Sequence, residues 1–225
     1  MGKNIRGISL AWLVAYNVIQ TLGWSYMGIK IVNHFLTNQT NIGLFKEVKM
    51  FLLVFQTAAI LEIVHTLIGI VRSNIVLTTI QVFSRVFIVW GILMTVEESQ
   101  ECIGFAMLLT AWTITEIIRY SFYAFGLFNS VPYFIMWLRY TLFIFLYPIG
   151  VTGECLAIYT SLEPVKNKEL FYFAMPNSLN FVFNYYYVLC STSILYLTNF
   201  PSLYLHMFAQ RKKNLDVSNK GSKIN

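Results

Sequence analysis

Long apolar stretches separated by short polar breaks run through almost the whole chain. Six of these stretches are about 20 residues or longer, which is the length that an α-helix needs to cross a bilayer. Apolar runs of this length without strict alternation are typical of transmembrane helices rather than strands. The pattern therefore predicts an all-α polytopic membrane protein, a bundle of six transmembrane helices. The predicted spans are residues 8–36, 44–71, 75–96, 103–128, 133–162 and 181–208.

The breaks between the spans carry residues that favour turns. Residues 37–41 read Thr-Asn-Gln-Thr-Asn, and residues 97–101 combine three glutamates with Ser and Gln. The longest connection, 163–180, contains two prolines, which end helices because they lack a backbone donor. We expect one membrane domain over residues 1–210 and a basic tail over residues 211–225.

Composition excludes several classes of protein. Hydrophobic residues make up 57% of the chain and charged residues 12%, whereas soluble domains carry about 45–50% and about 25%. The net charge is +6, but the basic residues form no single stripe, which argues against nucleic-acid binding. Cys102, Cys155 and Cys190 are widely spaced, so neither a disulfide framework nor a zinc site is expected. None has an Arg six positions later, so the chain contains no phosphatase loop of the Cys-x5-Arg type.

Basic residues in the loops predict the orientation, because Lys and Arg are enriched on the cytosolic side. With six spans, both termini lie on one side. That side would hold eight basic residues: Lys3, Arg6, Arg72, Arg211, Lys212, Lys213, Lys220 and Lys223. The opposite side would hold four: Lys46, Lys49, Lys166 and Lys168. This imbalance predicts cytosolic termini.

Among the charged residues inside the predicted spans, six are singled out, because each would cost about 2.5–3.5 kcal/mol at the bilayer centre. They are Glu62, Arg85, Glu116, Arg119, Arg139 and Glu154. One interpretation is structural: ion pairs between helices, with Glu116 and Arg119 three residues apart on one helix and able to pair directly. The other is functional. Glu62 and the three arginines lie at similar depth on the cytosolic side, which predicts an electropositive vestibule for an anionic ligand.

The fifth span contains the most unusual stretch, because Pro148 and two glycines interrupt an apolar helix. Proline removes one helical hydrogen bond and favours a kink. Tyr147 and Glu154 are seven residues apart, which places both on one side of the helix. A phenol and a buried carboxyl on one side suit proton abstraction and donation at adjacent atoms. The alternative is that Tyr147 belongs to an aromatic core and that Glu154 neutralises an arginine.

These residues also carry a resemblance to a known family. Tyr147-Pro-x-Gly-Val-x-Gly-Glu154 resembles the signature of the very-long-chain (3R)-3-hydroxyacyl-CoA dehydratases, once described as protein tyrosine phosphatase-like membrane proteins. Motifs in the first four spans are similar to that family in the same order. They are Ala15-Tyr16-Asn17 with Gly23-Trp24, Leu61-Glu62-Ile63-Val64-His65, Gln81-Val82-Phe83-Ser84-Arg85, and Trp112-Thr-x-Thr-Glu116-Ile-x-Arg119-Tyr120.

The resemblance implies a six-span enzyme of the endoplasmic reticulum membrane with cytosolic termini. It implies the third step of fatty acid elongation, in which a (3R)-3-hydroxyacyl-CoA loses water to give a trans-2-enoyl-CoA. Tyr147 and Glu154 match the catalytic pair of the family. No cofactor or metal is implied, and the elongase condensing enzymes and the reductases of the cycle are the expected partners. Substrate-binding or supporting roles are implied for Glu62, Gln81, Arg85, Glu116, Arg119, Arg139 and Gly150.

Dehydration needs a base for the proton on C2 and an acid for the departing hydroxyl on C3. We favour Glu154 as the base, because a carboxylate is far more available near neutral pH than a phenolate. Tyr147 would then protonate the leaving hydroxyl, although the reverse assignment stays open. The alternative function is a non-catalytic membrane scaffold, or a lipid-binding or transport protein that assists elongases.

Overall fold

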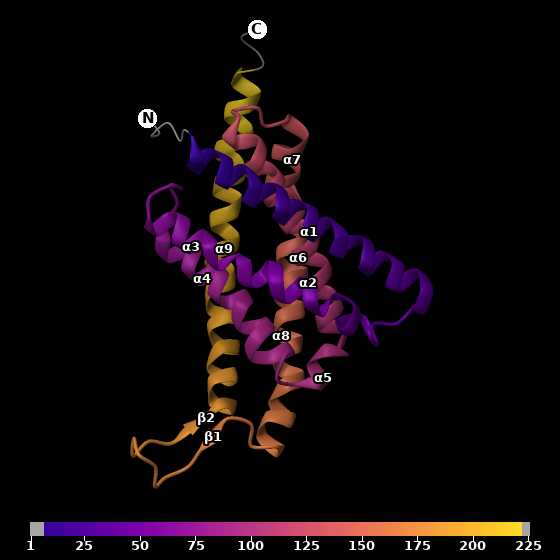
Figure 1. Ribbon diagram of the computed structural model, residues 1–225, viewed down its shortest axis with the longest axis vertical. Coiled ribbons are helices and arrows are strands. Elements are labelled where there is room, and N and C mark those ends of the chain that lie inside the picture. Colours follow the sequence, from indigo (N-terminus) through magenta and orange to yellow (C-terminus); the bar gives the residue numbers. More distant parts are fainter. Residues whose placement is uncertain (1–6, 222–225) are drawn as a thin grey trace.

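The computed structural model describes the backbone of residues 7–221 and the side chains of residues 7–214. Helices make up most of the described chain (Figure 1). The strands described there are β1, Tyr172–Phe173, and β2, Phe183–Asn184, which pair antiparallel as a short hairpin. The fold is therefore all-α apart from this hairpin, in agreement with the apolar pattern.

The helices follow the six predicted spans with two differences, and several spans contain two helices in succession. The helices that begin at Ile8, Phe143 and Tyr185 run past the predicted ends, and a short helix, Glu97–Gln100, lies in a predicted break. In order they are α1 Ile8–Asn38, α2 Leu44–Ala58, α3 Ile60–Leu67, α4 Ile75–Val86, the π-helix η1 Phe87–Leu93, α5 Glu97–Gln100, α6 Ile103–Leu127, α7 Tyr133–Thr141, α8 Phe143–Asn167 and α9 Tyr185–Gly221. The predicted span 133–162 is divided at Leu142. The predicted tail is helical as far as it is described, because α9 continues to Gly221.

Three stretches in the described chain are long and apolar enough to cross a membrane, judged by length and composition. They are Leu44–Leu67, Ile75–Leu93 and Phe143–Asn167. These stretches identify the chain as a membrane protein. They overlap the second, third and fifth of the six predicted spans.

Figure 1 shows α8 and α9 along the long axis of the molecule, with α1 and α2 crossing them obliquely. The first turn of α1 and the last turns of α9 lie at one end, and the β-hairpin lies at the other (Figure 1). The helix α6 makes its most extensive contacts with α8 and α1. The buried core gathers around it, and includes Trp24, Met27, Phe105, Leu108 and Ile158.

The backbones of α6 and α8 touch at two glycines. A Cβ on Gly153 would lie 2.6 Å from the backbone nitrogen of Leu108 and 2.7 Å from the carbonyl oxygen of Gly104. A Cβ on Gly104 would in turn lie 2.7 Å from the carbonyl oxygen of Gly153. Small residues allow such close approach between helices in membranes, where van der Waals packing and not water drives association. This contact fixes the axial position of α8 relative to α6.

Replacing Gly153 by Ala is expected to destabilise the fold by about 3 kcal/mol, the upper end of the range for overpacked sites, because the new methyl meets backbone. Thermal unfolding of the purified protein in detergent should show a clearly lower Tm. Gly150→Ala is the matched control on the same helix, since its Cβ would lie an ordinary 3.5 Å from the Ala111 side chain. Equal losses in both variants would contradict the close contact.

Candidate functional site

Arg119 on α6 binds two carboxylates at once. Its Nη1 and Nη2 donate to Oε2 and Oε1 of Glu62 on α3, each at 2.8 Å, and its Nε donates to Glu116 Oε2 at 2.9 Å. The hydroxyl of Tyr120 donates to Glu62 Oε1 at 2.5 Å and accepts from Arg119 Nη2 at 2.9 Å. Two parallel hydrogen bonds to one carboxylate are the strongest arrangement that a guanidinium offers. The pair Glu116–Arg119 that the sequence predicts is therefore formed.

Arg85 of α4 completes this network by pairing with Glu116. Two arginines and two glutamates from α3, α4 and α6 thus neutralise one another. The predicted vestibule of three arginines offset by fewer acids is not formed, because buried charges are stable only when paired. Arg139 lies apart: its guanidinium packs 4.5 Å from the ring centre of Phe122 and 4.8 Å from that of Tyr123, and donates to the Tyr123 hydroxyl at 3.3 Å.

A cavity of about 690 Å³ opens beside the network, between α1, α3, α4 and α6. Its polar lining includes Glu62, His65, Arg72, Gln81, Arg119 and Tyr123. Of the residues that the sequence singles out, Glu62, Gln81 and Arg119 reach this cavity. Arg85, Arg139, Tyr147 and Glu154 are not among its lining residues.

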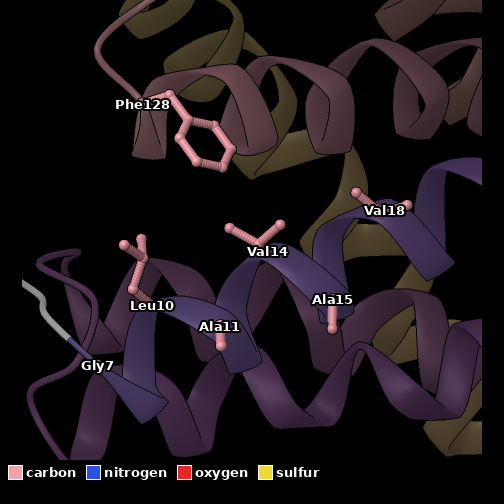
Figure 2. Close-up of a pocket in the computed structure, with 7 residues that line it drawn as sticks. All are labelled: Gly7, Leu10, Ala11, Val14, Ala15, Val18 and Phe128. Carbon is pink, nitrogen blue, oxygen red and sulfur yellow. The ribbon is translucent and has the colours of Figure 1, made fainter.

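A second pocket, of about 490 Å³, lies between the first turns of α1 and the end of α6. Figure 2 shows Leu10 and Val14 of α1 facing the ring of Phe128 across it. Its remaining lining residues are Gly7, Ala11, Ala15 and Val18, so no polar side chain reaches it. This pocket can accommodate apolar groups but offers no acid, base or cation for chemistry.

Tyr147 and Glu154 both lie on the side of α8 that faces α9. The Tyr147 ring stacks on Phe200 with centroids 5.3 Å apart and on Tyr204 at 6.0 Å, with interplanar angles of 10° and 4°. The Glu154 carboxyl adjoins Tyr196, which precedes Phe200 on α9 by one helical turn. No hydrogen bond joins Tyr147 to Glu154 in the described structure, and seven residues of straight helix separate them by about 10.5 Å along the axis.

Pro148 leaves a carbonyl of α8 without its usual partner, and α9 supplies another. The Tyr204 hydroxyl donates to the carbonyl oxygen of Ile144 at 3.0 Å. Ile144 is four residues before Pro148, the position whose carbonyl a proline cannot satisfy. This hydrogen bond ties α8 to α9 beside Tyr147.

The Glu154 carboxyl is buried and has two aromatic neighbours that carry donors. Trp112 on α6 donates from Nε1 to Glu154 Oε1 at 2.8 Å. The guanidinium of Arg85 lies 5.5 Å from the Trp112 ring centre, and its charge acts on Glu154. Arg85 therefore links the ion-pair network to the carboxyl. Glu154 thus combines burial, a hydrogen-bond donor and a nearby cation, an environment that is common around acid–base groups.

Sequence reasoning missed the roles of Trp112 and Tyr196. Trp112 lies four residues before Glu116, so both face the same side of α6. That spacing was a usable signal for Trp112. No signal in the sequence points to Tyr196, because its place beside Glu154 depends on how α8 and α9 align. Gly150 is buried and faces α6 at Ala111.

Comparison with known proteins gives a consistent result. Residues 56–217 match the family model described as "Protein tyrosine phosphatase-like protein, PTPLA". The chain is 46% identical over 222 residues to very-long-chain (3R)-3-hydroxyacyl-CoA dehydratase 2 of Mus musculus, covering 99% of this chain and 87% of the relative. It is 45% identical over 210 residues to the dehydratase hpo-8 of Caenorhabditis elegans, covering 93% and 96%. It is 38% identical over 224 residues to the dehydratase PASTICCINO 2 of Arabidopsis thaliana, covering 98% and 100%. No solved structure matches the chain.

Proposed function

Because the chain belongs to the family of protein tyrosine phosphatase-like proteins, PTPLA, we infer that it dehydrates a (3R)-3-hydroxyacyl-CoA to a trans-2-enoyl-CoA, the activity that its relatives' names carry. It is a hydro-lyase that acts in the third step of the fatty acid elongation cycle for long and very long chains. The sequence resemblance to this family is thereby confirmed. The observation that carries the assignment of the site is the Glu154 carboxyl, buried beside a donor and a cation.

For the mechanism, we propose that Glu154 removes the proton on C2 of the acyl chain. The C2–H electrons form the double bond to C3, and the C3–O bond breaks. Tyr147 then gives its phenolic proton to the departing hydroxyl, which leaves as water. Both groups face α9, so an acyl chain bound between them in the α8–α9 seam would present C2 to Glu154 and the C3 hydroxyl to Tyr147 at the same time. The low dielectric of the bundle interior strengthens each of these interactions.

We place the CoA portion of the substrate at the 690 Å³ cavity. Its lining combines cations, hydroxyls and an amide, which suits a phosphorylated and amide-containing arm. The helix α4 leads from this cavity toward Glu154, because Gln81 lines the cavity and Arg85, one turn further on, approaches the carboxyl. The acyl chain would then lie among apolar helices.

This placement predicts that Arg72→Gln weakens substrate binding without changing the chemical step. Loss of one phosphate contact should raise KM about 10-fold or more, since hydrogen bonds to charged groups contribute about 1.5–3 kcal/mol, while kcat stays near that of the wild type. Lys49→Gln is the control, because Lys49 lies on α2 away from the cavity, packed over the Phe45 ring. Equal KM values for all three proteins would contradict the placement.

We also propose that the chain crosses the endoplasmic reticulum membrane six times with both termini in the cytosol. Supporting this, the first turn of α1 and the end of α9 lie at one end of the molecule (Figure 1). The side with the termini carries the larger number of basic residues. The elongase condensing enzymes and the reductases of the cycle are the proposed partners, because they supply and consume its substrate and product.

Purified protein in lipid nanodiscs, supplied with a (3R)-3-hydroxyacyl-CoA, should form trans-2-enoyl-CoA detectable by mass spectrometry. The reverse hydration should also proceed when enoyl-CoA is supplied. Binding of the substrate without turnover would instead favour the scaffold or lipid-binding alternative.

A further inference from the structure

The Tyr196 hydroxyl is a buried polar group that the proposed mechanism does not use. Its oxygen is shielded from solvent and completes no hydrogen bond of good geometry in the described structure. It nevertheless lies beside two acceptors, the Glu154 carboxyl and the Ser84 hydroxyl. A buried hydroxyl without a partner costs about 1–3 kcal/mol, so its persistence at a reactive carboxyl calls for a role.

One oxygen of the Glu154 carboxyl already has a hydrogen-bond donor. The Trp112 indole can only donate a hydrogen bond, and it holds Oε1 at 2.8 Å. The oxygen left for proton transfer is therefore Oε2. A phenol can both donate and accept, so Tyr196 can serve Oε2 whether or not that oxygen carries a proton.

Ser84 determines where the Tyr196 hydrogen can go. The Ser84 hydroxyl donates to the carbonyl oxygen of Gln81 at 3.0 Å, so toward Tyr196 it presents only lone pairs. The single hydrogen of Tyr196 thus faces two acceptors. It belongs on Glu154 when the carboxylate is ionised, because hydrogen bonds to charged acceptors are the stronger ones. It can turn to Ser84 when Glu154 is protonated.

We propose that Tyr196 is a positioning residue for Glu154, holding Oε2 toward the substrate through both protonation states with Ser84 as its alternate acceptor. Before the reaction, Tyr196 donates to the Glu154 carboxylate. After Oε2 has taken the C2 proton, that O–H donates to the Tyr196 oxygen, and the Tyr196 hydrogen turns to Ser84. The carboxyl stays hydrogen-bonded at each stage. This inference rests on the proposed function.

Turnover tests the inference through Tyr196→Phe, which removes only the hydroxyl. We expect kcat to fall about 10- to 100-fold, the loss of one hydrogen bond to a charged group, with KM and Tm unchanged. Ser84→Ala should lower kcat by a smaller factor, because it removes only the alternate acceptor. The matched control is Tyr187→Phe on the same helix, whose side chain is 67% exposed. A kcat equal to that of wild type in Tyr196→Phe, or a fall matched by a lower Tm, overturns the positioning role.

A second measurement does not depend on turnover. Dicyclohexylcarbodiimide reacts with buried carboxyls, and peptide mass spectrometry reports the rate at Glu154. Tyr196→Phe should label several-fold faster than wild type and Tyr187→Phe, because the hydroxyl no longer covers Oε2. If the wild type does not dehydrate its substrate, the proposed function fails, and the labelling rates alone decide whether Tyr196 contacts Glu154. Equal labelling rates in the wild type and Tyr196→Phe overturn the inference. Faster labelling of Tyr196→Phe sustains the contact.

Discussion

Glu154→Gln and Tyr147→Phe are each expected to lower the rate of dehydration about 10²- to 10⁴-fold, the range that one general acid or base contributes. Gln cannot take the C2 proton, and Phe cannot give one to the leaving hydroxyl. Both substitutions keep the shape of the side chain, so the protein should still fold and bind substrate. Initial rates of enoyl-CoA formation by the purified variants, with substrate affinity measured separately, check both expectations.

Two positions on α8 serve as controls for these variants. Tyr159→Phe removes a phenol whose side chain is 73% exposed, and Glu163→Gln removes an exposed carboxyl near the end of the helix. Both should keep nearly full activity. If Tyr147→Phe retained normal turnover while Glu154→Gln lost it, the leaving-group role would pass from Tyr147 to another donor near Glu154.

Arg119→Met is expected to cost about 3–5 kcal/mol of stability, because it leaves Glu62 without its cation and leaves Glu116 with Arg85 alone. The side chains of Glu62 and Glu116 are only 14% and 2% exposed, so water replaces only a small part of the lost interaction. Unfolding in a denaturing detergent should show the loss. A double variant that also carries Glu62→Gln should recover part of it, since one of the stranded charges is then absent.

The exposed ion pair between Lys168 and Glu98 serves as a comparison for the buried pairs of Arg119. It joins the end of α8 to α5, with Lys168 Nζ 2.7 Å from Glu98 Oε1. Both side chains are largely exposed, and the lysine holds the pKa of Glu98 below its ordinary value through their hydrogen bond. Glu98→Gln should cost less than about 1 kcal/mol, as exposed pairs do. Comparable losses in Arg119→Met and Glu98→Gln would contradict the central position of Arg119.

Local pattern predicts much of this molecule. Apolar runs predict the helices, and the spacing of Glu116 and Arg119 predicts their ion pair, because both depend on the geometry of one helix. The partners across helices are different. Nothing in the local sequence says that Arg119 also takes Glu62, or that Trp112 donates to Glu154, since these contacts depend on how the helices align. The expected excess of positive charge is absent for this reason, because the carboxylates that pair with Arg85 and Arg119 across helices are not visible in the local sequence.

Charge pairing within α6 also bears on how the nascent chain enters the lipid. Glu116 and Arg119 can neutralise each other as soon as α6 has formed, before any other helix arrives. Glu62 on α3 and Arg85 on α4 carry opposite charges, and α3 and α4 follow each other along the chain. The charges of these two residues therefore cancel within a hairpin of α3 and α4. These four charges can therefore enter the lipid as two neutral pairs. When α6 packs against α3, Arg119 keeps Glu116 and binds Glu62 as well, which ties the two segments together.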